Sequence, residues 1–247
     1  GSLAAGDVAL EAVLDRAGAL RMPSVQAAVQ AATALALQPM PRGDRAIVVC
    51  NAGGPGILAL DEACAGGAAV APLKPATRDA LVATQSPHAT IGTMVDLAAT
   101  AGPPEFGAAL STLLAADEVD GLVLSMVTPF FVDCDGVARA VASAVAASGK
   151  PVTANVMTDA RWAGVVDILR AAGLPVYEFP EEAARAMAAM ARLAVLRDRP
   201  EVDPPGGLVD EARLRAVLAA ARPDRDGWLA QADAFDLLQA AGIRGAP

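Results

Sequence analysis

The fold is decided by residues 45–61, RAIVVCNAGGPGILALD. An apolar run ends at Cys50, a short loop with three glycines follows, and an apolar pattern of helical period begins at Ile57. A buried strand, a tight turn and a helix form the first unit of a parallel α/β sheet, in which the helix starts at the carboxyl edge of the strand. The stretch therefore predicts a strand over 46–50 and a helix over 57–65.

The start of that helix is a candidate anion-binding site. The first N–H groups of a helix have no partner within the helix, and the helix dipole adds partial positive charge there. Glycines leave room for a phosphate to reach the backbone. The loop is neither a GxGxxG fingerprint nor a Walker loop, and many turns of this kind hold no ligand. We expect free N–H groups on Gly54, Gly56 and Ile57, and phosphate contacts from Asn51, Gly53, Gly54, Gly56 and Ile57.

Strand and helix patterns alternate along most of the chain, which predicts a flavodoxin-like, doubly wound parallel sheet with flanking N- and C-terminal helices. The apolar runs at 46–50, 121–126 and 152–156 are expected to be buried on both faces. Shorter strands are predicted at 69–71 and 175–179, and 86–97 is predicted to be irregular. The predicted sheet-domain helices are 57–65, 76–84, 105–115, 136–147, 162–172 and 180–197.

Changes in composition divide the chain into four parts. Two amphipathic helices, over 8–17 and 25–37, make residues 1–43 an N-terminal helical segment with a linker. Residues 44–198 form the predicted sheet domain, and a proline- and glycine-rich stretch predicts a linker over 199–209. Two helices in 210–247, at 210–221 and 231–241, are too few to form a core, so they dock on the sheet domain or belong to a neighbouring domain.

Composition and charge exclude several classes of protein. The net charge of -9 over 247 residues argues against nucleic-acid binding, which needs a basic face. No apolar stretch reaches the roughly 20 residues that a membrane span requires, and no signal peptide is recognisable. Cys50, Cys64 and Cys134 lack metal-ligand spacing and are interpreted as reduced thiols of a cytoplasmic protein. We expect neither a metal site nor a catalytic residue in this chain.

Several polar residues have both a functional and a structural interpretation. His88, the only histidine, lies in a loop where a phosphoryl carrier would be mobile, but we interpret it as an ordinary loop residue. Cys134 has no histidine nearby in sequence to act as a base. Asn155, near the end of a predicted strand, is a candidate polar contact at the ligand edge. The carboxylates are expected to face solvent or complement helix dipoles, as at Asp61 and Glu62, or to cap a helix, as at Asp135.

Residues 51–56 (NAGGPG), Asp61 and Val95-Asp96-Leu97 resemble the NDP-forming acyl-CoA synthetases, the superfamily of ADP-forming acetate–CoA ligase and succinyl-CoA synthetase. The opening GSLAAGD resembles the residues that follow the family's phosphorylated histidine, and 228–243 resembles the start of its ATP-grasp portion. Thr93-Met94 replaces the asparagine–proline pair that the family shows before Val-Asp-Leu, which changes a turn-forming pair. Asp96 then either orients the glycine loop or caps the following helix.

The resemblance implies that the chain is the ligase-CoA region between the phosphohistidine loop and the ATP-grasp module. The family interconverts acyl-CoA, ADP and phosphate with carboxylate, ATP and CoA through a phosphohistidine held between two helix N-termini, one of which would be the glycine turn. The implied partners are CoA-binding and ATP-grasp domains or subunits, with phosphate as ligand; a homodimer is compatible. CoA, ATP or ADP and Mg would be used by the parent enzyme rather than bound by this chain, which alone is not expected to be active.

Two other interpretations stay open at this point. Pat-type protein lysine acetyltransferases fuse a synthetase-like regulatory region to an acetyltransferase domain, and the altered Thr93-Met94 pair fits such a region. A free-standing flavodoxin-like binding module is the third. The residues before Gly1 in the parent gene would discriminate, because a Ser-His-Thr ending favours the synthetase.

Overall fold

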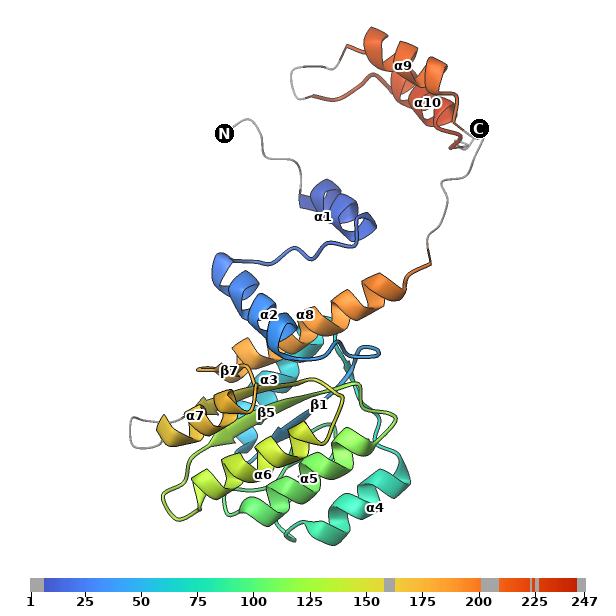
Figure 1. Ribbon diagram of the computed structural model, residues 1–247. Coiled ribbons are helices and arrows are strands. Elements are labelled where there is room, and N and C mark those ends of the chain that lie inside the picture. Colours follow the sequence, from blue (N-terminus) through green and yellow to red (C-terminus); the bar gives the residue numbers. More distant parts are fainter. Residues whose placement is uncertain (1–6, 158–162, 201–208, 223, 225–226, 244–247) are drawn as a thin grey trace. The chain divides into compact units, whose positions relative to one another are not determined.

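A computed structural model describes residues 7–157, 163–200, 209–222, 224 and 227–243 (Figure 1). The chain divides into two compact units, Gly1–Arg199 and Pro200–Pro247, which are described separately. The family-like opening at 1–6, residue 162 of a predicted helix and positions 201–208 of the predicted linker lie outside the described residues.

The larger unit is built on a mostly parallel sheet. Its strand order is β3-β4-β1-β5-β6-β7, and β2 pairs with the beginning of β1. The order β2-β1-β5-β6-β7 is that of a flavodoxin-like doubly wound sheet, so the predicted fold class is confirmed. The strands are β1 (Arg45–Cys50), β2 (Ala69–Val70), β3 (Thr90–Ile91), β4 (Val95–Asp96), β5 (Gly121–Val127), β6 (Val152–Met157) and β7 (Val176–Tyr177).

One predicted segment differs from the structure. Residues 86–97 were expected to be irregular, but β3 and β4 lie there and pair antiparallel, while β4 pairs parallel with the end of β1. Strands of two residues are too short to produce a periodic pattern. The prediction of an irregular segment is therefore wrong at these four positions.

Helices cover both faces of the sheet, and a further helix forms an outer layer (Figure 1). One face carries the helices that share a core with Ile47, Leu122 and Leu124, and the other carries those that pack on Val48 and Val123. The first group is α4 (Pro75–Thr84), α5 (Pro103–Ala115), α6 (Cys134–Ala146) and α7 (Ala163–Ala171); the second is α3 (Gly53–Ala65) and α8 (Pro180–Asp198). In the N-terminal segment, α1 (Asp7–Arg16) buries no residue, whereas α2 (Val25–Leu37) packs on α8.

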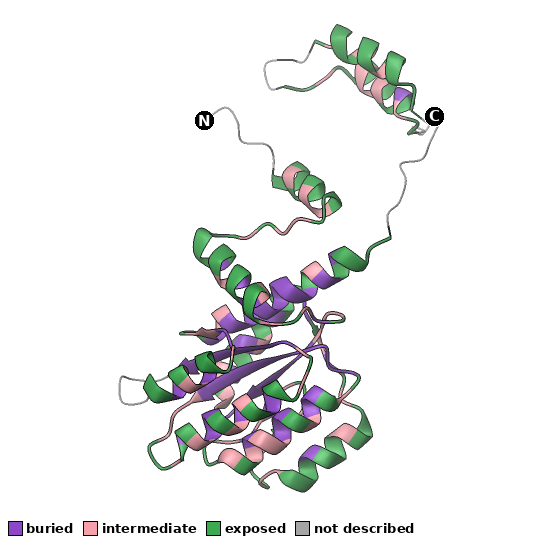
Figure 2. Cartoon of the chain, in the orientation of Figure 1, coloured by how far each residue is buried: buried purple, intermediate pink, exposed green. Residues whose placement is uncertain are grey.

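The three long strands are buried on both faces, as predicted (Figure 2). Only the first residue of β1 and the last residues of β5 and β6 are partly or fully exposed. Side chains alternate between the two faces of a strand, so a strand covered on both faces must be apolar throughout. This explains why the apolar residues of these three strands form continuous runs in the sequence and do not alternate with polar residues.

Small side chains bring α3, α8 and α2 close together. A Cβ atom added at Gly66 would lie 2.6 Å from the Cβ of Ala188, so α3 and α8 approach without room for a larger residue. On the outer side of α8, Ala34 of α2 packs with Ala186 and Met190. A core with 3% aromatic residues is thus possible because helices rich in alanine pack closely.

The smaller unit is a pair of helices, α9 (Glu211–Ala220) and α10 (Gln231–Ala240). Arg213 forms an ion pair with Asp236 at 3.2 Å, and the N–H of Asp210 donates to the carbonyl of Ala240. Of the described residues of this unit only Ala240 is buried, so these two helices form no core of their own. Within the described residues, neither unit has a helix long and apolar enough to cross a membrane.

Candidate functional site

The glycine turn lies inside α3 rather than before it. The helix begins at Gly53, four residues earlier than predicted, after an extended N-cap at Ala52 that makes no side-chain hydrogen bond. The N–H of Gly56 donates to the carbonyl of Ala52 at 3.2 Å, so the prediction that this group is free is wrong. Ile57 is the fifth helical residue, and regular helical geometry pairs its N–H with the carbonyl of Gly53.

The unpaired donors of the turn are therefore the N–H groups of Gly53 and Gly54. Pro55, the third helical residue, has no N–H. Within the described part of the chain, neither glycine N–H makes a hydrogen bond. Two adjacent unpaired donors therefore lie at the positive end of a 13-residue helix.

The three glycines serve different purposes. A Cβ atom at Gly54 would meet nothing within 4 Å, so this position is open to an approaching ligand. A Cβ atom at Gly53 would lie 3.2 Å from Oδ2 of Asp96. A Cβ atom at Gly56 would lie 2.4 Å from Sγ of Cys50, so glycine is required there for close contact between helix and strand.

Asn51 holds the turn in place. Its side chain is buried, its Nδ2 donates to the carbonyl of Val127 at 3.0 Å, and its Oδ1 accepts from the N–H of Val127 at 2.9 Å. The carboxamide thus continues the β1–β5 hydrogen bonding beyond the last strand residue of β1. The order of strands reverses between β1 and β5, which is where ligands bind in open α/β sheets. Asn51 therefore positions the loop, and one N–H of its carboxamide is not used in these two hydrogen bonds.

Asp96 lies beside the glycine turn and does not cap a helix. Its Oδ1 accepts from the N–H of Ala98 at 2.9 Å, and the N–H of Leu97 donates to the carbonyl of Cys50 at 2.8 Å. The N-cap of the following helix, α5, is Gly102, so the capping interpretation of Asp96 is wrong. Its carboxylate, near Gly53, complements the positive end of α3.

The cysteines near this edge are not nucleophiles. Burial, with the charge of Asp96, raises the pKa of Cys50 to about 12. Burial, with the charges of Asp135 and Asp133, also raises the pKa of Cys134, and its Sγ lies 3.5 Å from the carbonyl of Pro129. Both thiols are therefore neutral near pH 7.

The other candidates have structural surroundings. Asp133, not Asp135, caps α6, because its Oδ1 accepts from the N–H of Gly136 at 2.8 Å. Glu62 pairs with Arg185 of α8 at 2.7 Å, while Asp61 is exposed. His88 is exposed in the loop before β3.

Two aromatic residues at the same edge were not recognised in the sequence. Phe130 and Phe131 follow β5, are 85% and 58% exposed, and contact each other edge-to-face with ring centroids 5.2 Å apart. The usable signal was a pair of adjacent phenylalanines directly after Pro129 in a chain with 3% aromatic residues. The two rings therefore lie at the carboxyl edge of the sheet and are open to solvent.

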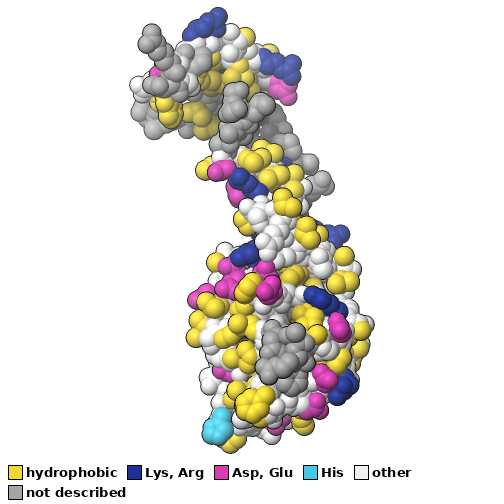
Figure 3. Space-filling model, turned by 90° about the vertical axis from the view of Figure 1, so that its left-hand side faces the viewer, with side chains coloured by type: hydrophobic (Ala, Val, Ile, Leu, Met, Phe, Trp, Pro, Cys, Tyr) yellow, Lys and Arg dark blue, Asp and Glu magenta, His cyan; other side chains and the backbone are white. Residues whose placement is uncertain are grey.

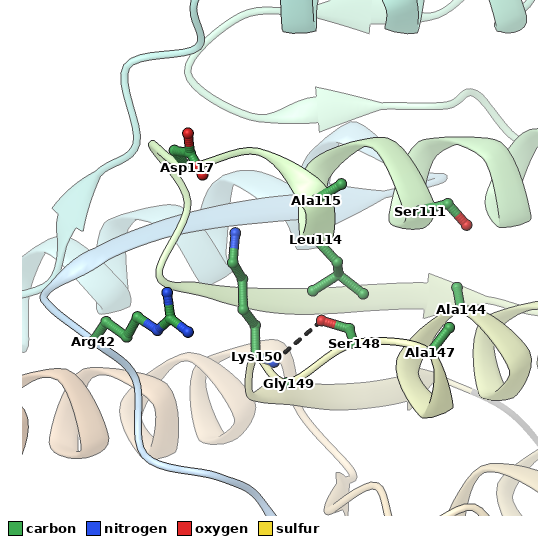
Figure 4. A pocket seen from close by; sticks show the side chains of 10 residues that line it. All are labelled: Arg42, Ser111, Leu114, Ala115, Asp117, Ala144, Ala147, Ser148, Gly149 and Lys150. Carbon is green, nitrogen blue, oxygen red and sulfur yellow. Dashed lines mark hydrogen bonds between the residues drawn. The ribbon is translucent and has the colours of Figure 1, made fainter.

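A separate cavity of about 350 Å³ lies at the opposite, amino edge of the sheet (Figure 4). Two cationic side chains line it: Lys150, which precedes β6, and Arg42, which precedes β1. Ser148 lies in the segment that joins α6 to β6. Asp117 also borders it, and the ends of α5 and α6 add the negative ends of helix dipoles. Because a carboxylate and two negative helix ends border the two cations, this cavity is not a preformed anion site.

Acidic and basic side chains are also interspersed on the face of the molecule that Figure 3 shows.

Comparisons with known proteins find relatives among ADP-forming acyl-CoA ligases. No protein-family model matches the chain. The chain is 32% identical over 200 residues to the alpha subunit of acetate–CoA ligase [ADP-forming] II of Pyrococcus furiosus. This alignment covers 78% of the chain and 43% of the relative. The chain is 28% identical over 195 residues to the 4-hydroxybutyrate–CoA ligase [ADP-forming] of Nitrosopumilus maritimus, covering 78% of this chain and 28% of the relative.

Solved structures show the same relationship. A protein from Pyrococcus horikoshii OT3 superposes with a TM-score of 0.73 at 30% identity, over 79% of this chain and 46% of that one. The dinucleotide-forming acetyl-coenzyme A synthetase 1 of Ca. Korarchaeum cryptofilum, in complex with phosphate and ADP, superposes with a TM-score of 0.72 at 26% identity, over 80% of this chain and 43% of that one. The chain thus spans less than half the length of these relatives. By sequence and by fold, it belongs to the NDP-forming acyl-CoA synthetase superfamily.

Proposed function

We propose that this chain is the part of an NDP-forming acyl-CoA synthetase that holds a phosphoryl group at the beginning of α3. The observation that carries the proposal is the pair of unpaired N–H groups on Gly53 and Gly54, at the point where the strand order reverses. Relatives are ADP-forming acyl-CoA ligases, and one related synthetase was solved with phosphate and ADP. Both findings support a phosphate at this site.

The geometry suits phosphoryl transfer. Such reactions depend mostly on positioning and on stabilising negative charge, and backbone donors that are already in place supply both. Asn51 fixes the loop to β5, and the contact of Gly56 with Cys50 fixes the first turn of α3 to β1. The two donors are therefore held rigidly before any ligand arrives.

The remaining parts of the reaction belong to other domains. The described residues bring together no group of three or more His, Cys, Asp or Glu side chains that could hold a metal ion. We place CoA, ATP or ADP and Mg on CoA-binding and ATP-grasp domains or subunits, which would meet this chain at the edge that carries Phe130 and Phe131. Residues 44–198 are then the ligase-CoA region, and residues 210–247 lead toward the ATP-grasp portion. A homodimer is compatible with this proposal. A cytoplasmic location is also compatible with it, because the three cysteines are free thiols.

The proposal is tested by Gly54→Val in the full-length synthetase. An added Cβ atom meets nothing within 4 Å, so the fold should persist while the side chain blocks the approach to the backbone. Loss of one preorganised donor costs about 2.7–4 kcal/mol in other enzymes, so phosphoryl transfer should slow about a hundredfold or more. The measurement is the rate of phosphoenzyme formation from labelled ATP.

Gly149→Val is the matched control, because Gly149 is equally open but lies before β6 at the amino edge. It should transfer phosphate at the normal rate. A folded Gly54→Val enzyme with normal transfer would show that the glycine turn does not hold the phosphoryl group.

A further inference from the structure

Two polar side chains face each other inside the protein. Ser125 of β5 and Asn155 of β6 are register partners, and they are 1% and 0% exposed. Thr153, two residues before Asn155, donates its hydroxyl to the carbonyl of Ala183 in α8, and Val123, two residues before Ser125, packs in the cluster that contains α3 and α8. Because side chains alternate along a strand, Ser125 and Asn155 also face the α3–α8 layer.

Neither side chain has a hydrogen-bond partner among the residues that the structure describes. Oγ of Ser125 and both Oδ1 and Nδ2 of Asn155 are buried and unpaired. Buried polar groups in folded proteins are almost always paired, and each group left unpaired costs about 1–3 kcal/mol. Two adjacent residues with three such atoms therefore indicate a bound partner that is not among the described residues.

The chemistry of the three atoms restricts that partner. Nδ2 of Asn155 can only donate, Oδ1 can only accept, and the Ser125 hydroxyl can do both. A chloride ion has no proton to give to Oδ1, and a metal ion cannot accept from Nδ2. A hydrogen phosphate ion can donate and accept, but it would bring a negative charge into a buried place where neither Ser125 nor Asn155 supplies a positive one. The partner must donate and accept, carry no charge, and be small enough for a fully buried place.

We propose that Ser125 and Asn155 bind an ordered water molecule between the sheet and the α3–α8 layer. Water bound in protein interiors typically makes about three hydrogen bonds to groups that would otherwise be unpaired, which matches the three atoms here. Cys50 is the register partner of Ser125 on the other side, and the first turn of α3 packs on Cys50. The water therefore lies in the row formed by Cys50, Ser125 and Asn155, on the face that the first turn of α3 covers. Its site is separate from the backbone N–H groups proposed to hold a phosphate.

A high-resolution crystal structure of the protein is the direct test. We expect solvent density about 2.7–3.2 Å from Oγ of Ser125 and from the carboxamide of Asn155. Density for a larger molecule, or a direct hydrogen bond between the two side chains without solvent, would overturn the proposal.

A pair of near-isosteric substitutions tests it in solution. Asn155→Leu removes two of the three groups that hold the water and leaves the Ser125 hydroxyl unpaired, so the urea midpoint should fall. Adding Ser125→Ala should recover part of the loss, because the site is then apolar. If the amide is simply unpaired in the native protein, Asn155→Leu raises the midpoint, and that sign overturns the water site.

Thr153→Val is the control for sensitivity. Its hydroxyl has a partner within the protein, so the midpoint should fall under either interpretation. The crystal structure decides the question if the variants do not fold.

Discussion

The two edges of the sheet use polar groups in opposite ways. At the amino edge, Asp120 accepts three hydrogen bonds from Arg45, and Glu118 accepts from the N–H of Lys74 and the hydroxyl of Thr77. At the carboxyl edge, the N–H groups of Gly53 and Gly54 are unpaired among the described residues.

The difference teaches how stability and binding are separated in this fold. Buried carboxylates at the amino edge are satisfied within the chain, so they stabilise strand starts and the beginning of α4 and offer little to a ligand. Backbone donors at the carboxyl edge remain available, and a rigid support of Asn51, Cys50 and Gly56 keeps them in place. Substitutions at the amino edge should change stability, whereas exposed substitutions at the glycine turn should change function.

The largest stability effect is expected from Asp120→Ala. Asp120 is 6% exposed, and its loss leaves the backbone N–H and Nε of Arg45 without their acceptor, while Nη2 keeps the carbonyl of Asp117. Breaking a buried ion pair costs about 3–5 kcal/mol, and because the Arg45 side chain is 40% exposed and can reach water, we expect about 3 kcal/mol. Urea denaturation measures the loss. A loss below about 1 kcal/mol would contradict the assignment of this edge to stability.

A comparison of two glycines sharpens the contrast within the carboxyl edge. Gly56→Ala places a methyl group 2.4 Å from Sγ of Cys50, and such overpacking should cost about 1–3 kcal/mol. Gly54→Ala adds a methyl group in open space, so the free energy of unfolding should change by less than about 0.5 kcal/mol. Thermal and urea denaturation of the two variants check this. Equal losses would show that the first turn of α3 is packed on all sides.

The smallest effect concerns acid stability and Glu118→Gln. Burial alone would raise the pKa of Glu118, but hydrogen bonds from Thr77 and the N–H of Lys74, with the Lys74 charge, outweigh it and lower the pKa from 4.5 to about 2. A lowered native pKa stabilises the fold above the unfolded pKa, and this stabilisation is lost as the pH falls from about 4.5 toward 2.

The glutamine variant keeps an acceptor for both hydrogen bonds, so it should lose only about 1 kcal/mol at pH 7. Between about pH 5 and 2 its unfolding free energy should fall less steeply than that of the wild type. The measurement is a series of denaturation curves over this range. Parallel pH dependences would show that Glu118 is not specifically stabilised in its charged form.

The sequence was a good guide wherever a pattern was long. Apolar runs located β1, β5 and β6, and helical periods located α2 through α8, because burial on one or both faces leaves a repeated signal. It failed where a structure depends on distant residues. The strands β3 and β4 have two residues each, and they exist because β4 pairs with the end of β1.

Two site assignments failed for the same reason. Gly56 is needed because of Cys50, which precedes it in the chain but approaches it only when the helix packs on the strand. Asp96 lies beside Gly53 only because β4 pairs with β1, and nothing in its own segment distinguishes this from a helix cap.

By itself, therefore, the sequence determined the α/β class, the order of the long elements, the carboxyl end of β1 with its glycine turn, and the resemblance to the synthetases. Only the tertiary structure decided which backbone donors are free, which side chains support them, and that Ser125 and Asn155 meet without a partner. Periodicity is local and survives in a linear sequence. Pairing, close contact and unsatisfied hydrogen bonds arise only when residues far apart in the chain are brought together.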